Sequence, residues 1–552
     1  MQWVTNVETQ RRDETMPKFT LNGQEIEAKN GQTIIQAAGE HGVEIPHYCY
    51  HPDLPIDGNC RMCLVDVEKM PKLTPACTTL ANEGMVVRSD NARVKEAVRG
   101  VLEFLLINHP VDCPVCDQAG ECRLQDYYMV YGLHTSEIPL GMKVRKRKVI
   151  DLGPMVVLDQ ERCVLCSRCI RFFEHVTDTG EMQFFGRGDH VAIGTFEDRP
   201  LDNPYSGNVV DICPVGALTS RDFRFKCRVW FLHATDSVCA GCSTGCAVRI
   251  DHRDGAIFRM IPRRNPEVNR SWLCDEGRLS FHELNNTERV QRPLVKDKDG
   301  VQAPVTWEEA VRSIDSRLKE TRDTNGGDSI LGFASPSATN EALFLFKRYL
   351  ADQAGATQFD FRVDCEEKKL AEEEDQILRH FDKHPNSMGA IKLGLISDDL
   401  DGIEGAVKAA REGRIKAGVV IYFKPLVKRP SDDEAEGRIL ELIEELDYSV
   451  VLAAHQADWQ ASASVVLPVA AWSEEDGTYT NFEGRVQFAG KAIEPARDAL
   501  PVWEVFAMLL HASGAASPWM SAADVFATMS ESAPAYREIS LDQTRLPGVV
   551  VG

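Results

Sequence analysis

The placement of the cysteines constrains this chain more than any other feature. Of 17 cysteines in 552 residues, sixteen precede residue 275 and only Cys365 follows. The first fifteen residues are polar and lack the apolar stretch of an export signal, so we expect the thiols to stay reduced. Clustered cysteines in a reducing compartment are more often metal ligands or catalysts than disulfides. The two halves of the chain are therefore expected to do different jobs.

Length and composition exclude several classes of protein. A chain of this length is expected to form about three to five domains, and 43% hydrophobic with 26% charged residues is typical of globular proteins. No apolar run approaches the roughly 20 residues that cross a bilayer, so we expect no membrane insertion. The net charge of −22 disfavours nucleic acid as a partner. The short basic run 143–148 is accordingly interpreted as an exposed strand.

The first cysteine group lies within a predicted small β domain. The alternating runs 18–21 and 24–27 flank Asn22-Gly23, which predicts a hairpin, and Ile34 to His41 is predicted to be helical. A strand is expected at Leu64–Val67. The cysteines follow in a C-x10-C-x2-C-x13-C pattern: Cys49, Cys60, Cys63 and Cys77. Four thiolates can hold a [2Fe-2S] cluster, and a four-cysteine zinc site is the alternative.

The second group combines three cysteines with one histidine. A helix is predicted over Glu96–Asn108 and is stopped by Pro110. After it the pattern is H-x3-C-x2-C-x5-C: His109, Cys113, Cys116 and Cys122. With no fourth cysteine nearby, His109 is the candidate fourth ligand of a [4Fe-4S] cluster. A neutral imidazole in place of a thiolate leaves the cluster less negative, which raises its reduction potential.

The third group is typical of bacterial ferredoxins. A C-x2-C-x2-C triplet precedes a distant Cys-Pro pair: Cys163, Cys166, Cys169 and Cys213-Pro214. Phe173 stands where a two-cluster ferredoxin has a further cysteine. Only one [4Fe-4S] cluster is therefore expected, and Cys213 completes its ligand set.

The fourth group is C-x2-C-x3-C-x27-C: Cys239, Cys242, Cys246 and Cys274. A [4Fe-4S] site is predicted, with a zinc ribbon as the alternative. The four groups use 16 ligands and leave over only Cys227 and Cys365, which we interpret as small buried apolar residues. Four centres in series suit one-electron transport, so no catalytic acid or base is expected.

The order and spacing of these groups, with His109 as the odd ligand, resemble the large iron–sulfur subunit (75 kDa type) of bacterial respiratory complex I, the NADH:quinone oxidoreductase. The resemblance implies one [2Fe-2S] and three [4Fe-4S] clusters in a subunit that passes electrons from the flavin/NADH-binding subunit toward quinone, with the cluster of the Cys239 group lying off the main electron path. It also implies contacts with other peripheral-arm subunits and a peripheral place on the cytoplasmic side of the inner membrane. The first three groups occur in some hydrogenases and NAD-linked formate dehydrogenases too.

The second half resembles a molybdopterin oxidoreductase domain, most closely at 292–296, 305–310, 335–341 and 477–487. Independently of this resemblance, short apolar strands are predicted to alternate with helices, which indicates an open α/β sheet: Ser329–Phe333, Gly418–Tyr422, Ser449–Ala453 and Ser464–Pro468.

Two features of this half argue against molybdenum chemistry. Active enzymes of the resembled class carry a lysine two places after the last cluster cysteine, where this chain has Glu276. Cys365 precedes an acidic run, Glu366–Asp375, rather than an obvious pocket. No molybdenum is therefore expected. The alternatives are the catalytic subunit of a formate dehydrogenase-like molybdenum or tungsten enzyme and a zinc-stabilised scaffold.

The expected fold is multidomain, α+β and then α/β, in chain order. The predicted domains are a disordered extension (1–16), a β-grasp [2Fe-2S] ferredoxin domain (17–95), a helical one-His, three-Cys domain (96–150), a bacterial-ferredoxin-like domain (151–228), a four-Cys domain (229–288), a truncated molybdopterin-oxidoreductase-like α/β domain (289–512) and a loose tail with a helix or two (513–552).

Overall fold

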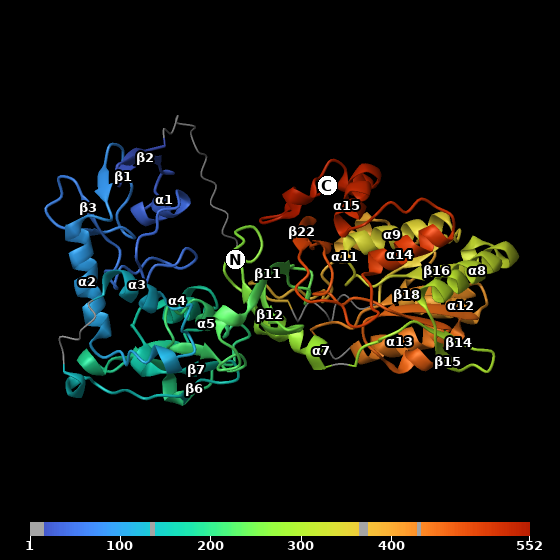
Figure 1. The fold of residues 1–552 in the computed structure, drawn as a ribbon, viewed down its shortest axis with the longest axis horizontal. Helices are drawn as coiled ribbons and strands as arrows, with labels where there is room; N and C mark the ends of the chain where they lie inside the picture. Colours follow the sequence, from blue (N-terminus) through green and yellow to red (C-terminus); the bar gives the residue numbers. More distant parts are fainter. Residues whose placement is uncertain (1–15, 133–138, 287, 364–373, 428–431, 552) are drawn as a thin grey trace. The chain divides into compact units, whose positions relative to one another are not determined.

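The computed structural model describes residues 16–132, 139–286, 288–363, 374–427 and 432–551 (Figure 1). Its contacts divide the chain into two compact units, Met1–Trp230 and Phe231–Gly552. The predicted extension (except its last residue), Cys365 and most of the acidic run after it lie outside the described residues. No helix in the described part of the chain has the length and apolar character needed to cross a membrane.

The first unit begins with a five-stranded sheet in the order β2-β1-β5-β3-β4. The predicted hairpin is confirmed: Lys18 pairs with Glu27 and Leu21 with Gln24. Asn22 and Gly23 both have positive φ, as a tight hairpin turn requires. The elements are β1 (Lys18–Leu21), β2 (Gln24–Glu27), α1 (Ile34–Glu40), β3 (Leu64–Val67), β4 (Thr74–Pro75) and β5 (Val86–Arg88).

The rest of this unit is built from short helices and small sheets. α2 (Ala92–Leu106) starts earlier than predicted because the Asn91 side chain accepts a hydrogen bond from Val94 N and caps the helix. The remaining elements are α3 (Arg123–Tyr131), β6 (Ile150–Asp151), β7 (Val156–Leu158), α4 (Arg168–His175), β8 (Met182–Phe185), β9 (Ala192–Thr195), α5 (Asn208–Asp211) and β10 (Leu218–Ser220).

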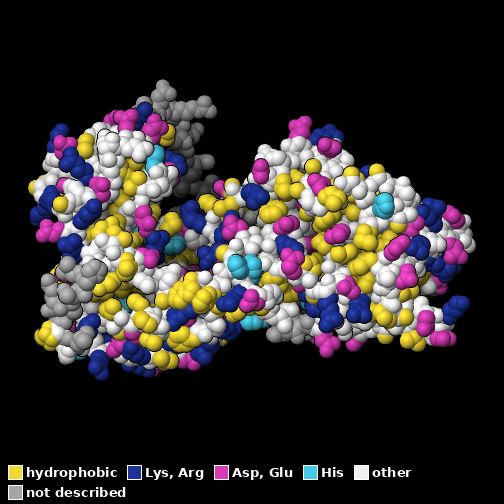
Figure 2. All heavy atoms as spheres, viewed as in Figure 1, with side chains coloured by type: hydrophobic (Ala, Val, Ile, Leu, Met, Phe, Trp, Pro, Cys, Tyr) yellow, Lys and Arg dark blue, Asp and Glu magenta, His cyan; other side chains and the backbone are white. Residues whose placement is uncertain are grey.

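The interpretation of 143–148 as a strand is wrong. These residues have no regular structure, and the strand begins only at Ile150. Their cations bind locally instead: Lys143 Nζ donates to the carbonyl of His109, and Lys148 Nζ lies 2.8 Å from Glu161. On the face shown in Figure 2, basic side chains are interspersed with acidic ones over both units.

The second unit starts with a three-stranded antiparallel sheet, β11 (His233–Val238), β12 (Ala247–Arg253) and β13 (Ala256–Pro262), followed by α6 (Asp275–Leu279) and α7 (Phe281–Asn286). A seven-stranded sheet follows in the order β15-β14-β20-β19-β18-β16-β17. Its strands are β14 (Leu294–Lys296), β15 (Gln302–Pro304), β16 (Ile330–Phe333), β17 (Gln358–Asp360), β18 (Ala417–Tyr422), β19 (Tyr448–Ala453) and β20 (Val465–Pro468). The four predicted strands are thus confirmed to within one residue.

Helices cover both faces of this sheet (Figure 1). Alternate residues of one strand enter different cores: Val419 and Ile421 pack with one set of helices, and Val420 packs with the other. The first set is α8 (Trp307–Asn325), α9 (Asn340–Asp352), α14 (Val502–Ala512) and α15 (Ala522–Ser532), and the second is α12 (Gly402–Arg411) and α13 (Asp432–Glu445). A short helix, α11 (Ser387–Lys392), contacts α9.

The last forty residues contain the predicted helix but are not a loose tail. Met529 and Tyr536 are fully buried in the core beside α9 and α14. A small sheet joins β21 (Gly477–Thr480), β22 (Arg485–Ala489) and β23 (Val549–Val550). The buried apolar side chains fix the segment, and a sequence rich in alanine and proline gave little sign of this.

Candidate metal centres

The first group lies on loops around β3. Cys49, Cys63 and Cys77 are buried. The Cys49 thiol interacts with those of Cys60 and Cys77, and this lowers the pKa of Cys49 far below its usual range. Cys63 interacts with Cys77 in turn. The four sulfurs thus form one connected set, whose contacts lower the pKa of Cys49 and Cys63 and raise the pKa of Cys60 and Cys77.

The second group encloses a cavity of about 150 Å³. Its lining includes all four predicted ligands, His109, Cys113, Cys116 and Cys122. Burial lowers the pKa of His109 to about 4, so its imidazole is neutral at pH 7 and keeps a nitrogen lone pair for a metal. One water-sized sphere needs only about 10–15 Å³. The cavity therefore offers more room than a single ion requires.

A glycine completes the wall of this cavity. Gly216 follows the third group's Cys213, yet a Cβ at this position would lie 2.5 Å from the Cys116 sulfur. Only a residue without a side chain leaves the Cys116 thiol in place. The close approach brings the segment after Cys213 against the second group.

The third group is gathered at the start of α4. Cys166 and Cys169 are buried, and burial raises the pKa of Cys163 to about 12 and that of Cys166 to about 11. Neighbouring thiols raise these pKa values further, and Cys213 acts on Cys163, Cys166 and Cys169 alike. Thiols in such a place ionise only when a bound cation offsets the charge. Leu165 N donates to the Cys163 sulfur at 3.4 Å.

The fourth group joins the β11–β12 turn to the start of α6. Cys239 and Cys246 flank the turn, and Cys274 is the N-cap residue of α6, with its sulfur accepting from Gly277 N at 3.3 Å. A Cβ at Gly277 would lie 3.0 Å from the Cys239 sulfur and 3.2 Å from that of Cys274. Burial raises the pKa of Cys239 to about 12. The glycine keeps open the space that the sulfurs surround.

The predicted ligands are not arranged to bind a single metal ion. In the described ranges, no three His, Cys, Asp or Glu side chains are placed to hold one metal ion. Iron–sulfur ligands bind different irons of one cluster and so stand apart from one another. Open cavity, close glycines and buried thiols together fit cluster binding in these groups.

Two arginines that sequence reasoning missed link the first and third groups. Arg168 donates to Tyr50 O at 2.5 Å and to Ile212 O at 2.9 Å, next to Cys49 and Cys213. Arg171 donates to Cys49 O. The only sequence feature that could have pointed to these arginines is their position within two residues of Cys169. This feature is weak, because a charged residue near a cysteine is usually exposed.

The structure describes one of the two thiols outside the four groups. Cys227 is partly exposed rather than buried, and its thiol lies 3.5 Å from Arg228 O.

Glu276, which stands where active molybdenum enzymes have a lysine, forms an ion pair with Arg379 at 2.8 Å and lies 3.9 Å from Lys383. This anion is thus neutralised within the protein.

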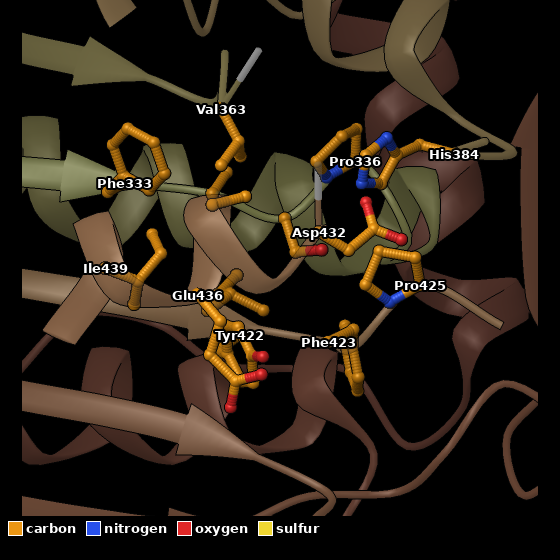
Figure 3. Close-up of a pocket in the computed structure, with 14 residues that line it drawn as sticks. Phe333, Pro336, Val363, His384, Tyr422, Phe423, Pro425, Asp432, Glu436 and Ile439 are labelled. Atoms are coloured by element: carbon orange, nitrogen blue, oxygen red, sulfur yellow. The ribbon is translucent and has the colours of Figure 1, made fainter. Parts of the chain in front are cut away.

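A pocket lies at the carboxyl ends of β16 and β18, where open α/β sheets bind ligands (Figure 3). Phe333, Tyr422, Asp432 and His384 contribute to its lining. Its volume is about 40 Å³, whereas cofactor pockets usually measure about 300–1,000 Å³. This pocket does not fit a pterin cofactor.

Comparison with known families gives matches along most of the chain. The matching family models are a 2Fe-2S iron-sulfur cluster binding domain (14–92), the NADH-ubiquinone oxidoreductase-G iron-sulfur binding region (99–137), the NADH-quinone oxidoreductase subunit 3 ferredoxin-like domain (153–219), the NADH-ubiquinone oxidoreductase NDSU1/NuoG-like 4Fe-4S domain (232–282) and molybdopterin oxidoreductase (289–385 and 378–512). The fold and its sites therefore define a multidomain iron–sulfur oxidoreductase subunit.

Individual relatives show to which family of iron–sulfur oxidoreductase subunits the chain belongs. The G subunit of NADH-quinone oxidoreductase from Rickettsia conorii is 32% identical over 87% of this chain and 85% of its own length. The protein of the same name from Rickettsia bellii is 40% identical over 64% of this chain, and the NADH-ubiquinone oxidoreductase 75 kDa subunit of Reclinomonas americana is 39% identical over 69%. These two alignments span about half the length of the relatives, 51% and 55%. The chain belongs to the family of the G (75 kDa) subunit of NADH-quinone oxidoreductase.

Proposed function

We propose that this chain is an electron-relay subunit of NADH-quinone oxidoreductase, which passes single electrons from the flavin subunit toward quinone. When bound, iron–sulfur clusters supply sites that accept and release one electron at a time. We assign one [2Fe-2S] cluster to the first group and one [4Fe-4S] cluster to each of the other three, with the 16 predicted ligands.

The observation that carries this proposal is the central place of the third group in the first unit. Arg168 contacts backbone beside both Cys49 and Cys213, which joins the first group to the third. The segment after Cys213 reaches the second group, since Arg123 N donates to Pro214 O at 3.1 Å and Gly216 lies against Cys116. Electrons are accordingly proposed to run from the first group through the third to the second.

The chain's own residues tune the proposed clusters. Backbone N–H groups donate to the sulfurs of Cys60, Cys163 and Cys274, at 3.4, 3.4 and 3.3 Å. Such hydrogen bonds offset negative charge on sulfur and raise the reduction potential. His109 acts in the same direction, because a neutral ligand replaces an anionic one.

The proposed partners and location follow from the proposal that the chain is a subunit of a larger complex. The partners proposed are the flavin/NADH-binding subunit and other peripheral-arm subunits, on the cytoplasmic side of the inner membrane. We propose that the α/β domain at 289–512 is a scaffold that binds no molybdenum. The domain boundaries given in the sequence analysis also belong to this proposal, except for the loose tail.

Anaerobic purification followed by metal analysis tests the proposal. We expect about 14 irons with matching acid-labile sulfide, and electron paramagnetic resonance (EPR) signals of both cluster types. Cys213→Ser should remove one [4Fe-4S] signal and block NADH-to-quinone electron flow, while Cys227→Ser, the matched control outside the four groups, should change neither. Zinc in place of sulfide would refute the relay. Stoichiometric molybdenum or tungsten with formate oxidation would instead support the formate dehydrogenase-like alternative.

A further inference from the structure

Arg168 occupies an unusual position for a cation. It is the first residue of α4, its relative exposure is only 9%, and it lies between the first and third cysteine groups. A buried charge is costly unless it is paired and hydrogen-bonded. Within the described ranges, Arg168 forms no ion pair with an Asp or Glu side chain. The usual partner of a buried arginine is therefore missing.

The hydrogen bonds of Arg168 are incomplete as well. The two terminal nitrogens donate to the carbonyls of Tyr50 and Ile212. The third nitrogen, Nε, is buried, and no described residue accepts a hydrogen bond from it. An unsatisfied buried donor costs about 1–3 kcal/mol, so a site that keeps one usually has an acceptor in its working state.

The neighbours of Arg168 identify the acceptor's chemistry. The sulfurs that act most strongly on the guanidinium are those of Cys166 and Cys213, and Cys49 follows after the nearby Arg171. Two of these thiols belong to the third group and one to the first. The electrostatic neighbours of the guanidinium are therefore cysteine sulfurs, which become anionic when they bind a cluster. Arginine stays protonated in proteins, so the site keeps its positive charge at any ordinary pH.

We infer that Arg168 is a positioning residue for electron transfer, which donates its Nε–H to sulfur of the third-group cluster and raises the reduction potentials of the third-group and, less strongly, the first-group cluster. Reduction adds one negative charge to a cluster, and a fixed cation nearby stabilises that reduced state. The two carbonyl contacts hold the guanidinium in place between the clusters.

Arg171 does not duplicate this role. Its Nε donates to Ser167 Oγ at 3.0 Å, and its terminal nitrogens donate to the carbonyls of Pro55 and Cys49. All three of its nitrogens therefore have protein acceptors. Arg171 fastens the loop of the first group to α4, whereas Arg168 keeps one donor free for a cluster.

The inference rests on the proposed cluster ligation, and redox titration followed by EPR separates the two. The full chain is purified anaerobically as the wild type, as Arg168→Gln, as Arg168→Lys and as Arg221→Gln. Arg221 serves as the matched control, because it lies in the same unit but its partner Asp151 is exposed to solvent that screens the pair. Iron and sulfide content are measured for each protein. Absence of cluster signals from the wild type would overturn the proposed function itself.

With clusters present in the wild type, Arg168→Gln should disfavour reduction of the third-group cluster about tenfold, which is about 59 mV for a one-electron couple. The first-group signal should shift in the same direction by less. Arg168→Lys keeps the charge but cannot supply the Nε–H, so its shift should be smaller but measurable. If Arg168→Gln loses its iron, the reduction potentials of Arg168→Lys test the inference instead. A wild-type potential in any variant of Arg168 that retains its clusters overturns the inference.

Discussion

The close approach of Gly216 to Cys116 makes the second group sensitive to a single methyl group. A Cβ at position 216 would lie 2.5 Å from the Cys116 sulfur and 3.0 Å from Gln118 Cβ. Gly216 does not adopt a positive φ, so alanine causes no backbone strain there. Gly216→Ala therefore isolates a steric effect on one ligand of the second group.

The size of the effect follows from these distances. An ordinary contact begins near 3.4 Å, so the Cys116 sulfur must move by about 0.9 Å. Metal–ligand distances tolerate deviations of about 0.2 Å, and the required shift is several times larger. Overpacking of this kind also costs about 1–3 kcal/mol of stability. We expect the second-group cluster to be lost or weakly held while the chain stays folded.

Iron analysis with EPR checks this expectation. Gly216→Ala should lose about four of about 14 irons and one [4Fe-4S] signal, with the third-group signal retained because Cys213 keeps its place. Gly194→Ala is the matched control, since a Cβ there would make only ordinary contacts of 3.6 Å with Phe185. Full iron content and an unchanged second-group signal in Gly216→Ala would show that the Cys116 sulfur is not a ligand at this position.

Three further outcomes are expected. His109→Cys should retain the second-group cluster but lower its reduction potential, because a thiolate adds negative charge; an unchanged set of EPR titrations would remove His109 from the ligand set. Glu276→Lys should lower the unfolding free energy by about 1–3 kcal/mol, since three cations then converge beside α6, and a wild-type thermal midpoint would contradict this. Burial raises the pKa of Glu475 to about 8 and of Glu341 to about 7, so the folded state binds more protons than the unfolded state above pH 4.5 and stability falls as pH rises toward 8. Thermal midpoints from pH 5 to 9 should show this fall, and Glu475→Gln should flatten it; an equally steep fall in that variant would contradict the assignment.

Local patterns in the sequence predicted a large part of the fold. The hairpin at 18–27 follows from two alternating runs around Asn22-Gly23, whose positive φ values suit only a few residue types. The parallel strands follow from short apolar runs such as the predicted Gly418–Tyr422, and the observed β18 (Ala417–Tyr422) is buried along almost its whole length. Each of these signals lies within a few residues of chain. Their physical cause is equally local, so one sequence suffices to find them.

The cysteine groups were also found from local spacing, and the structure places the members of each group together. That they bind clusters remains a prediction. The residues around them were not predictable, since burial of Arg168 depends on carbonyls of Tyr50 and Ile212, which are 118 and 44 residues away. The prediction of a loose tail was wrong for the same reason, because the contacts that bury this segment are distant in sequence. Its composition resembles a linker, yet Met529 and Tyr536 have a core to enter.

The fourth group shows how a distant segment can complete a site. Its turn carries polar groups that the residues 378–382 satisfy: Ser243 N donates to Asp382 O at 2.9 Å, and Thr244 Oγ1 donates to Leu378 O at 2.7 Å. Ser243 Oγ also lies 2.7 Å from His380 Nδ1, across 137 residues of chain. These bonds add to the turn's own, such as Gly245 N donating to Cys242 O at 3.3 Å, and together they fix the segment between Cys242 and Cys246. The α/β domain therefore has a structural role of its own, because part of it holds the fourth cysteine group in shape.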